Sequence, residues 1–144
     1  MQRDLLLLGE MIDAAERAGE LVSGIPVEAL QADRLRSESL LWNFTVLGEA
    51  ATQLSDDIKE RFPGIPWQQP ARLRNRIVHG YWSIDLDILH TTATDQLPTF
   101  AAGLRQILDT LTAEEPSAAA TTPETAAPAA AEQPQDLPRS DGEG

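Results

Sequence analysis

The sequence contains no cysteine, and this absence removes several kinds of chemistry at once. Disulfides, thiolate metal sites and a cysteine nucleophile are all excluded. The chain also has only two histidines, His79 and His90. They are too few for a metal cage built from histidine, unless carboxylates supplement them. We therefore expect neither a metal site nor a cofactor.

Long apolar runs are absent as well. No run approaches the roughly eighteen residues that a membrane-spanning helix requires. At the start of the chain an acidic residue, Asp4, directly precedes the apolar residues 5–8, and this order lacks the layout of a signal peptide. The sequence therefore predicts no membrane association and a cytoplasmic localisation.

Basic residues are scarce, with 11 Lys and Arg against 23 Asp and Glu and a formal net charge of −12. Half of this negative excess lies after residue 112. An acidic surface repels nucleic acid over most of its area, so we do not expect a protein that grips long duplexes. A local arginine cluster on the remaining, moderately acidic part could still engage a few phosphates.

Apolar residues recur at three- and four-residue spacing along most of the chain, which is typical of amphipathic helices. Helical segments are predicted at 2–21, 27–54, 55–62, 66–80 and 85–112. Within the second segment we expect an irregularity near residues 32–33. In the last one, Pro98 should kink or divide the helix because proline lacks the N–H that the helix needs. Ser83 or Asp85 could cap its start.

The second helical segment carries most of the large apolar side chains. We expect Leu35, Trp42 and Phe44 to be buried, together with the leucines that follow them. Gly48 lies in the middle of this segment, where glycine costs about 1 kcal/mol relative to alanine. Close approach of another helix is the expected compensation.

No segment alternates as a strand would, so the sequence predicts an all-α fold, a helical bundle with an up-and-down course. Residues 1–112 form the expected domain. Residues 113–144 are rich in Ala, Pro, Thr and Glu and contain almost no large apolar side chains. Such a composition cannot offset its ordering entropy, and we expect a disordered acidic tail.

The stretch 71–84 concentrates polar and titratable side chains within an otherwise ordinary helical chain, which is where a site is expected. Its chemistry-bearing residues are Arg72, Arg74, Arg76, His79 and Tyr81. An arginine fork binds phosphate oxygens and neutralises charge that develops in a transition state. Histidine, with a reference pKa of about 6.5, exchanges protons near neutral pH. Together they suit RNA cleavage by the 2′-hydroxyl, without a metal or a protein nucleophile.

Helical geometry complicates this arrangement. On a straight helix Arg74 and His79 are roughly 140° apart, whereas Arg72, Arg76 and His79 fall within about 60° of one another. Arg74 and His79 can converge if the helix loosens around His79 and Gly80, where glycine makes loosening plausible. Alternatively, two protomers supply groups to one pocket. The sequence leaves both routes open.

The string R-N-R-I-V-H-G-Y at 74–81 resembles the core motif of HEPN-domain ribonucleases, specifically the HepT toxins of HepT/MntA toxin–antitoxin modules. Further segments resemble the family in the same order, namely A-D-R-L at 32–35, L-G-E-A at 47–50, R-F-P-G-I-P-W at 61–67 and the acid-spaced helix after Tyr81. The resemblance covers residues 4–111. The proline of Gln68-Gln69-Pro70-Ala71 and the tail depart from the family pattern.

The resemblance implies a homodimeric helical bundle that cuts RNA, with tRNA as the expected class, in a composite cleft without metal. Arg74 and His79 match the catalytic positions, and Asn75 matches the polar residue that orients them. Arg76 is a supporting candidate that could contact RNA phosphate. Tyr81 matches the tyrosine to which the partner, an MntA-like minimal nucleotidyltransferase antitoxin, transfers AMP. The added charge and bulk would oppose RNA binding.

Plainer interpretations of the same residues remain. The chain could be a non-catalytic helical module that binds a nucleotidyltransferase through these arginines. Arg72 and Arg76 could instead pair with Asp85 and Asp87. Glu49, an acid in an apolar run, is either exposed or paired with Arg74 or Arg76. His90 has no partner at a recognisable spacing, so we expect a structural or surface role.

Overall fold

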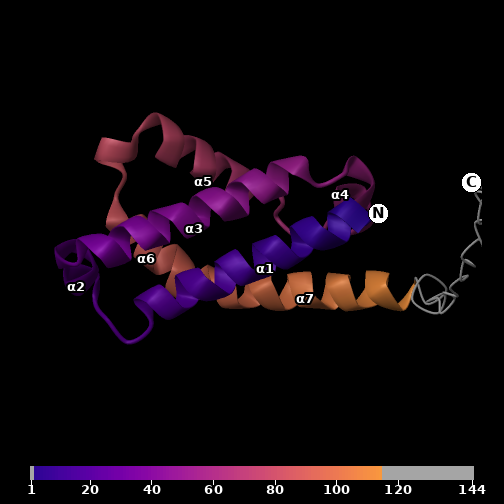
Figure 1. The fold of residues 1–144 in the computed structure, drawn as a ribbon, viewed down its shortest axis with the longest axis horizontal. Coiled ribbons are helices and arrows are strands. Elements are labelled where there is room, and N and C mark those ends of the chain that lie inside the picture. Colours follow the sequence, from indigo (N-terminus) through magenta and orange to yellow (C-terminus); the bar gives the residue numbers. More distant parts are fainter. Residues whose placement is uncertain (1, 115–144) are drawn as a thin grey trace, which may run out of the picture. The chain divides into compact units, whose positions relative to one another are not determined.

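The computed structural model describes residues 2–114, and within them all regular structure is helical. The elements are α1 Gln2–Val22, α2 Val27–Ala32, α3 Arg34–Gln53, α4 Asp56–Arg61, α5 Gln68–His79, the 3-10 turn η1 Tyr81–Ser83, α6 Leu86–Thr91, the π-helical turn η2 Thr92–Gln96, and α7 Leu97–Ala113. The long helices α1, α3, α5 and α7 alternate in direction (Figure 1). The predicted all-α fold is confirmed.

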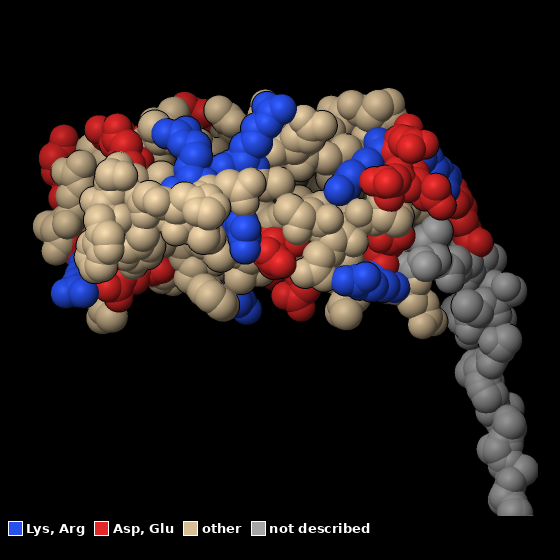
Figure 2. Space-filling model, turned by 90° about the horizontal axis from the view of Figure 1, so that it is seen from above, with Lys and Arg blue, Asp and Glu red and all other residues tan. Residues whose placement is uncertain are grey.

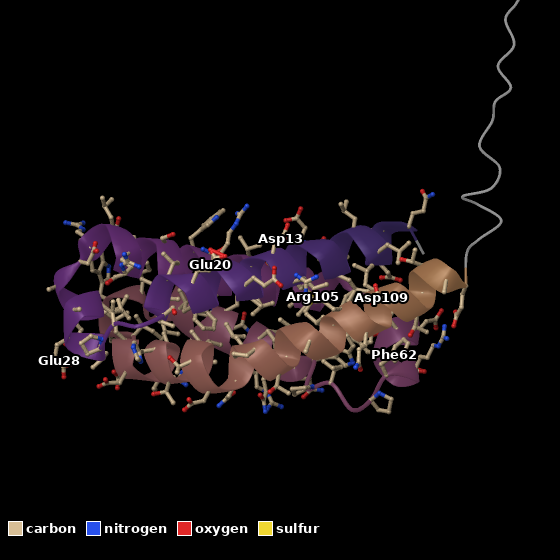
Figure 3. The ribbon with its side chains drawn as sticks, turned by 90° about the horizontal axis from the view of Figure 1, so that it is seen from below. Asp13, Glu20, Glu28, Phe62, Arg105 and Asp109 are labelled. Carbon is tan, nitrogen blue, oxygen red and sulfur yellow. The ribbon has the colours of Figure 1, made fainter. Side chains whose placement is uncertain are left out.

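The core lies where α1 packs against α3 and α7. Buried leucines, isoleucines and alanines from the periodic stripes of these helices fill it, and Leu8, Leu40 and Leu104 are fully enclosed. Arg105 of α7 points toward α1 (Figure 3) and donates to Glu16 from Nε at 2.9 Å. That hydrogen bond raises the pKa of Arg105. This exposed ion pair links α1 to α7 but adds little to the stability of the fold.

Local sequence sets the helix ends. Gly24 has a φ of +76°, a left-handed conformation that glycine adopts freely, and it turns the chain after α1. Asp33 closes α2 and caps α3, where its side chain accepts from the N–H of Arg36. The predicted irregularity at 32–33 is thus a complete break. Ser55 caps α4 in the same way.

The last predicted helix is divided, as Pro98 required. Asp85 rather than Ser83 caps α6 by accepting from the N–H of Asp87. The helix then widens into η2, where the N–H of Leu97 reaches back to the carbonyl of Thr92. Pro98 follows in the first turn of α7, where its missing N–H costs nothing.

Two side chains predicted to be buried are exposed. Leu35 is 81% exposed and Trp42 66% exposed, whereas Phe44 is buried as expected. Leu35 and Trp42 lie two turns apart on one stripe of α3. That stripe runs between the sides on which α1 and α5 pack, so neither helix covers it. The prediction was wrong because periodicity identifies an apolar face without showing what covers it.

Of the structural and surface roles expected for His90, the structure supports the structural one, since its Nε2 lies 2.7 Å from the carbonyl oxygen of Ile25 and ties α6 to the turn after α1. Asp4 is buried and accepts hydrogen bonds from the N–H and hydroxyl of Ser55. Within residues 2–114 no helix combines the length and apolar character that crossing a membrane demands. From residue 115 the predicted tail lies outside the described residues.

Candidate active site

Helix α5 carries the candidate residues and is fixed to the rest of the domain at its start. Trp67, just before it, is buried, and its indole N–H donates to the carbonyl of Phe62 at 2.9 Å. Pro70 is also buried and lies in the first turn, where a proline removes no hydrogen bond that the helix could make. The departure from ordinary helix formers at this position is therefore compatible with the helix.

Helix α5 lies unusually close to α3 at Gly48. A Cβ atom built at position 48 would overlap the Cβ of Arg74 and the carbonyl oxygen of Pro70. The predicted close helix approach at Gly48 is confirmed. Its consequence is that the backbone of α5 sits against α3 at the position from which the Arg74 side chain starts.

The Arg74 side chain is held over α3 and is about 30% exposed. Its Nη2 lies 3.2 Å from Oε2 of Glu49, and its Nη1 donates to Oδ1 of Asn75 at 3.0 Å. Of the two alternatives for Glu49, the pairing with Arg74 is confirmed. The Arg74 Nε is buried and has no hydrogen-bond partner within the described part of the chain. This one donor of the guanidinium is therefore enclosed by protein and unsatisfied in the described residues.

His79 lies elsewhere on α5. The helix remains regular through His79 and ends only at Gly80, whose N–H donates to the carbonyl of Arg76. The loosening that would bring Arg74 and His79 together is therefore absent. Since they are roughly 140° apart on this helix, the two side chains start on different faces of one protomer.

The outer face of α5 is polar and open. Asn75, Arg76 and His79 are all exposed, and so is Arg72, which donates to Oε1 of Gln68 at 2.8 Å. Seen from this side, several basic side chains gather near the middle of the face among uncharged ones (Figure 2). Neither Arg72 nor Arg76 forms an ion pair within residues 2–114, so the alternative pairing with Asp85 and Asp87 is not found there.

Tyr81 and Trp82 stand in η1, directly after α5. Tyr81 is 40% exposed and Trp82 92% exposed, and their rings meet edge to face with centroids 5.3 Å apart. Both aromatic rings are thus accessible to another molecule.

Two grooves flank α5. The larger, of about 560 Å³, lies between α5 and the run from α6 to α7, with α3 as its floor. The smaller, of about 350 Å³, lies on the α1 side and includes Arg74, Glu49 and Trp42. Sequence reasoning missed the larger groove, because its walls come from segments far apart in the chain. Across residues 2–114 no group of three or more His, Asp or Glu side chains could hold a metal ion.

Comparison with known proteins decides the family. The family described as "Ribonuclease HepT-like" matches residues 11–107, which includes α3, α5 and the whole motif. The chain is a HepT-like ribonuclease. The sequence resemblance to HepT proteins is thereby confirmed, and so is the assignment as an enzyme that cleaves RNA.

Relatives of this HepT-like ribonuclease carry corresponding names. It is 27% identical over 92 residues to the protein "Probable ribonuclease HepT" of Thermococcus cleftensis, and the matched residues make up 64% of this chain and 84% of the relative. It is 24% identical over 101 residues to a protein of Caldanaerobacter subterraneus likewise named in terms of RNase activity, covering 70% of this chain and 90% of the relative. No solved structure matches the HepT-like chain.

Proposed function

We propose that this HepT-like ribonuclease is the toxin of a toxin–antitoxin pair and that it cuts RNA, with tRNA as the expected class, without a metal ion. The observation that carries the proposal is the motif on α5, where the Arg74 fork is held over α3 and His79 is exposed on another face of the same helix. In this mechanism His79 removes the 2′-hydroxyl proton and the 2′-oxygen attacks the adjacent phosphorus. The bond to the 5′-oxygen breaks to leave a 2′,3′-cyclic phosphate, that oxygen takes a proton from water, and the resulting hydroxide takes the proton that His79 holds. Arg74 neutralises the charge on the phosphate oxygens.

The site is completed by a second protomer. Because Arg74 and His79 lie on different faces of one regular helix, Arg74 of one protomer acts with His79 of the other. Four exposed apolar side chains supply surface for such a homodimer. They are Leu35 and Trp42 on α3, Val78 on α5 and Trp82 in η1. Aromatic side chains of this kind are enriched in the buried centres of interfaces.

Regulation falls to Tyr81. Its phenol is accessible in η1, two residues after His79, and it is the acceptor of AMP from an MntA-like nucleotidyltransferase antitoxin in this proposal. Transfer adds a phosphodiester charge and a bulky nucleoside beside the motif. Both oppose the approach of RNA phosphates, the first by repulsion and the second by steric exclusion.

Expression of the chain without its partner tests the proposed function. We expect wild-type protein to arrest growth and to shorten a discrete RNA on a gel, and we expect His79→Ala to do neither, because proton transfer alone contributes a factor of roughly 10²–10⁴. A circular dichroism melt verifies that the variant is folded. If wild type leaves growth and RNA unchanged while still binding the nucleotidyltransferase, the chain is a non-catalytic binding module instead.

Treatment with the nucleotidyltransferase and ATP tests the regulatory part. We expect a mass increase of one or more AMP units on wild-type protein and none on Tyr81→Phe, which lacks the phenolic oxygen. Cleavage by modified wild type should fall at least tenfold, whereas cleavage by Tyr81→Phe should persist after the same treatment. Inhibition of both proteins to the same extent would show that the partner acts by covering the cleft.

A further inference from the structure

The larger groove beside α5 has the dimensions and lining of a small-ligand site. Its volume of about 560 Å³ falls within the range of roughly 300–1,000 Å³ that is usual for such sites. Apolar side chains from α3, α5 and α7 form the floor of the groove, including Phe44, Leu73 and Phe100. Aromatic and aliphatic groups of this kind accept the flat face of an unstacked base.

Cations line one wall of this groove. Arg72 and Arg76 lie one turn apart on α5 and both border the opening. Both are exposed, and neither is neutralised by an ion pair within residues 2–114. The groove thus has an apolar floor beside two guanidinium groups that no ion pair neutralises. Such a surface is complementary to a ligand that has a flat apolar part and an adjacent phosphate.

A carboxylate faces them from the other wall. Asp95, in η2, borders the same groove and is exposed. A carboxylate there repels a second phosphate, but it accepts hydrogen bonds from the exocyclic amino group of cytosine, adenine or guanine. Uracil offers no such amino group. The groove therefore has two unlike walls. The wall on α5 suits a phosphate of the ligand, and the wall on η2 suits an amino group of the ligand.

We propose that this groove binds one unpaired nucleobase of the RNA substrate, with the adjoining phosphate on Arg72 and Arg76 and an exocyclic amino group on Asp95. The inference rests on the proposed function and deepens it by naming the substrate as single-stranded RNA that presents an amino-bearing base. Arg72, Arg76 and His79 lie within about 60° of one another on α5, so the strand that leaves the groove along the arginines runs toward His79. A paired base, stacked inside a duplex, does not reach the groove.

Nucleotide binding to the purified full-length protein tests the groove apart from catalysis. The probes are CMP, UMP and ribose 5-phosphate, measured by calorimetry. We expect CMP to bind more tightly than UMP, and ribose 5-phosphate to bind least. Arg76→Ala should weaken CMP binding about tenfold, the usual effect of losing a charge-assisted hydrogen bond. Arg17→Ala, which removes an exposed arginine of α1 that does not line the groove, is the matched control and should leave binding unchanged.

Two further variants separate base recognition from charge. Asp95→Asn should bring the affinities for CMP and UMP to within about twofold of each other, because an amide can serve either base. Ile88→Trp places a large ring over the opening, where Ile88 is 37% exposed, and should abolish CMP binding while the charges stay in place. A thermal melt shows whether Ile88→Trp is folded. If that variant does not fold, the comparison of CMP and UMP binding by Asp95→Asn, a change at an exposed position, tests the site instead.

Cleavage of a short single-stranded RNA of mixed sequence connects the groove to the substrate. We expect Ile88→Trp to slow cleavage and CMP to inhibit wild type competitively. Equal binding of CMP by wild type, Arg76→Ala and Ile88→Trp would overturn the proposed site, even if wild type cleaves RNA. Cleavage that is unchanged in Ile88→Trp, despite lost CMP binding, would overturn its role in substrate binding. A groove that binds CMP as expected in a chain that cuts no RNA would instead refute the proposed function.

Discussion

Replacing Gly48 by alanine is expected to lower the free energy of unfolding by about 2 kcal/mol, the middle of the range for overpacking a tight contact. The added methyl group would overlap the Cβ of Arg74 and the carbonyl oxygen of Pro70. Both atoms belong to the backbone or its first side-chain carbon, so neither can rotate away. Helix α5 as a whole must move off α3, and the variant should lose cleavage along with stability.

The sign of this change is informative because helix propensity alone predicts the opposite. Alanine is favoured over glycine by about 1 kcal/mol in a helix interior. Gly9 and Gly19 in α1 serve as matched controls, because nothing lies within 4 Å of a Cβ atom built at either one. Urea titration should show both control variants unchanged or slightly stabilised. A stabilised Gly48→Ala protein would mean that α5 lies farther from α3 than the structure places it.

Mixing two inactive variants is expected to restore RNA cleavage. Arg74→Ala and His79→Ala should each lower the cleavage rate at least about 100-fold, because each removes a group that acts in the transition state. In a mixed dimer, the protomer with His79→Ala still supplies Arg74 and its partner still supplies His79. One composite site is then intact, and random pairing restores about one quarter of the wild-type sites.

This complementation distinguishes the two ways in which Arg74 and His79 can meet. If both groups act from one protomer, no pairing of the two variants contains an intact site and the mixture stays inactive. Subunits should be exchanged by dilution and reconcentration before assay, and the double variant Arg74→Ala/His79→Ala mixed with itself is the control. Arg74→Lys tests the fork separately, since lysine keeps the charge but cannot bind two phosphate oxygens side by side.

Most of the fold could be predicted from spacing and from helix-ending residues. Asp33, Gly24 and Pro98 act on the backbone of their own segment, so the break, the turn and the division that they cause are visible locally. Gly48 was also informative, because a glycine in a helix interior requires a compensating contact. The pairing of Glu49 with Arg74 followed as one of two alternatives for an acid in an apolar run.

The parts that could not be predicted depend on which elements meet in space. Leu35 and Trp42 share the apolar character of the buried leucines of α3, and only the positions of α1 and α5 decide that they are exposed. The groove beside α5 combines residues of α3, η2 and α7 with Arg72 and Arg76, and no spacing along the chain connects them. The motif itself was recognisable. The sequence could not decide, however, whether Arg74 and His79 meet through a loosened helix end or through a site that two protomers share.

The packing of α5 has a consequence for hydrogen exchange. The long helices pack in the order α5, α3, α1 and α7, so α5 rests chiefly on α3 and α7 chiefly on α1. A helix held by one neighbour can open without unfolding the rest, so its amide protons exchange through a local opening that costs less than global unfolding. The element that bears the motif is thus one of the two long helices, with α7, that pack chiefly on a single long neighbour. Any partner that contacts both α5 and α7 would suppress that opening and register as protection confined to residues 68–79.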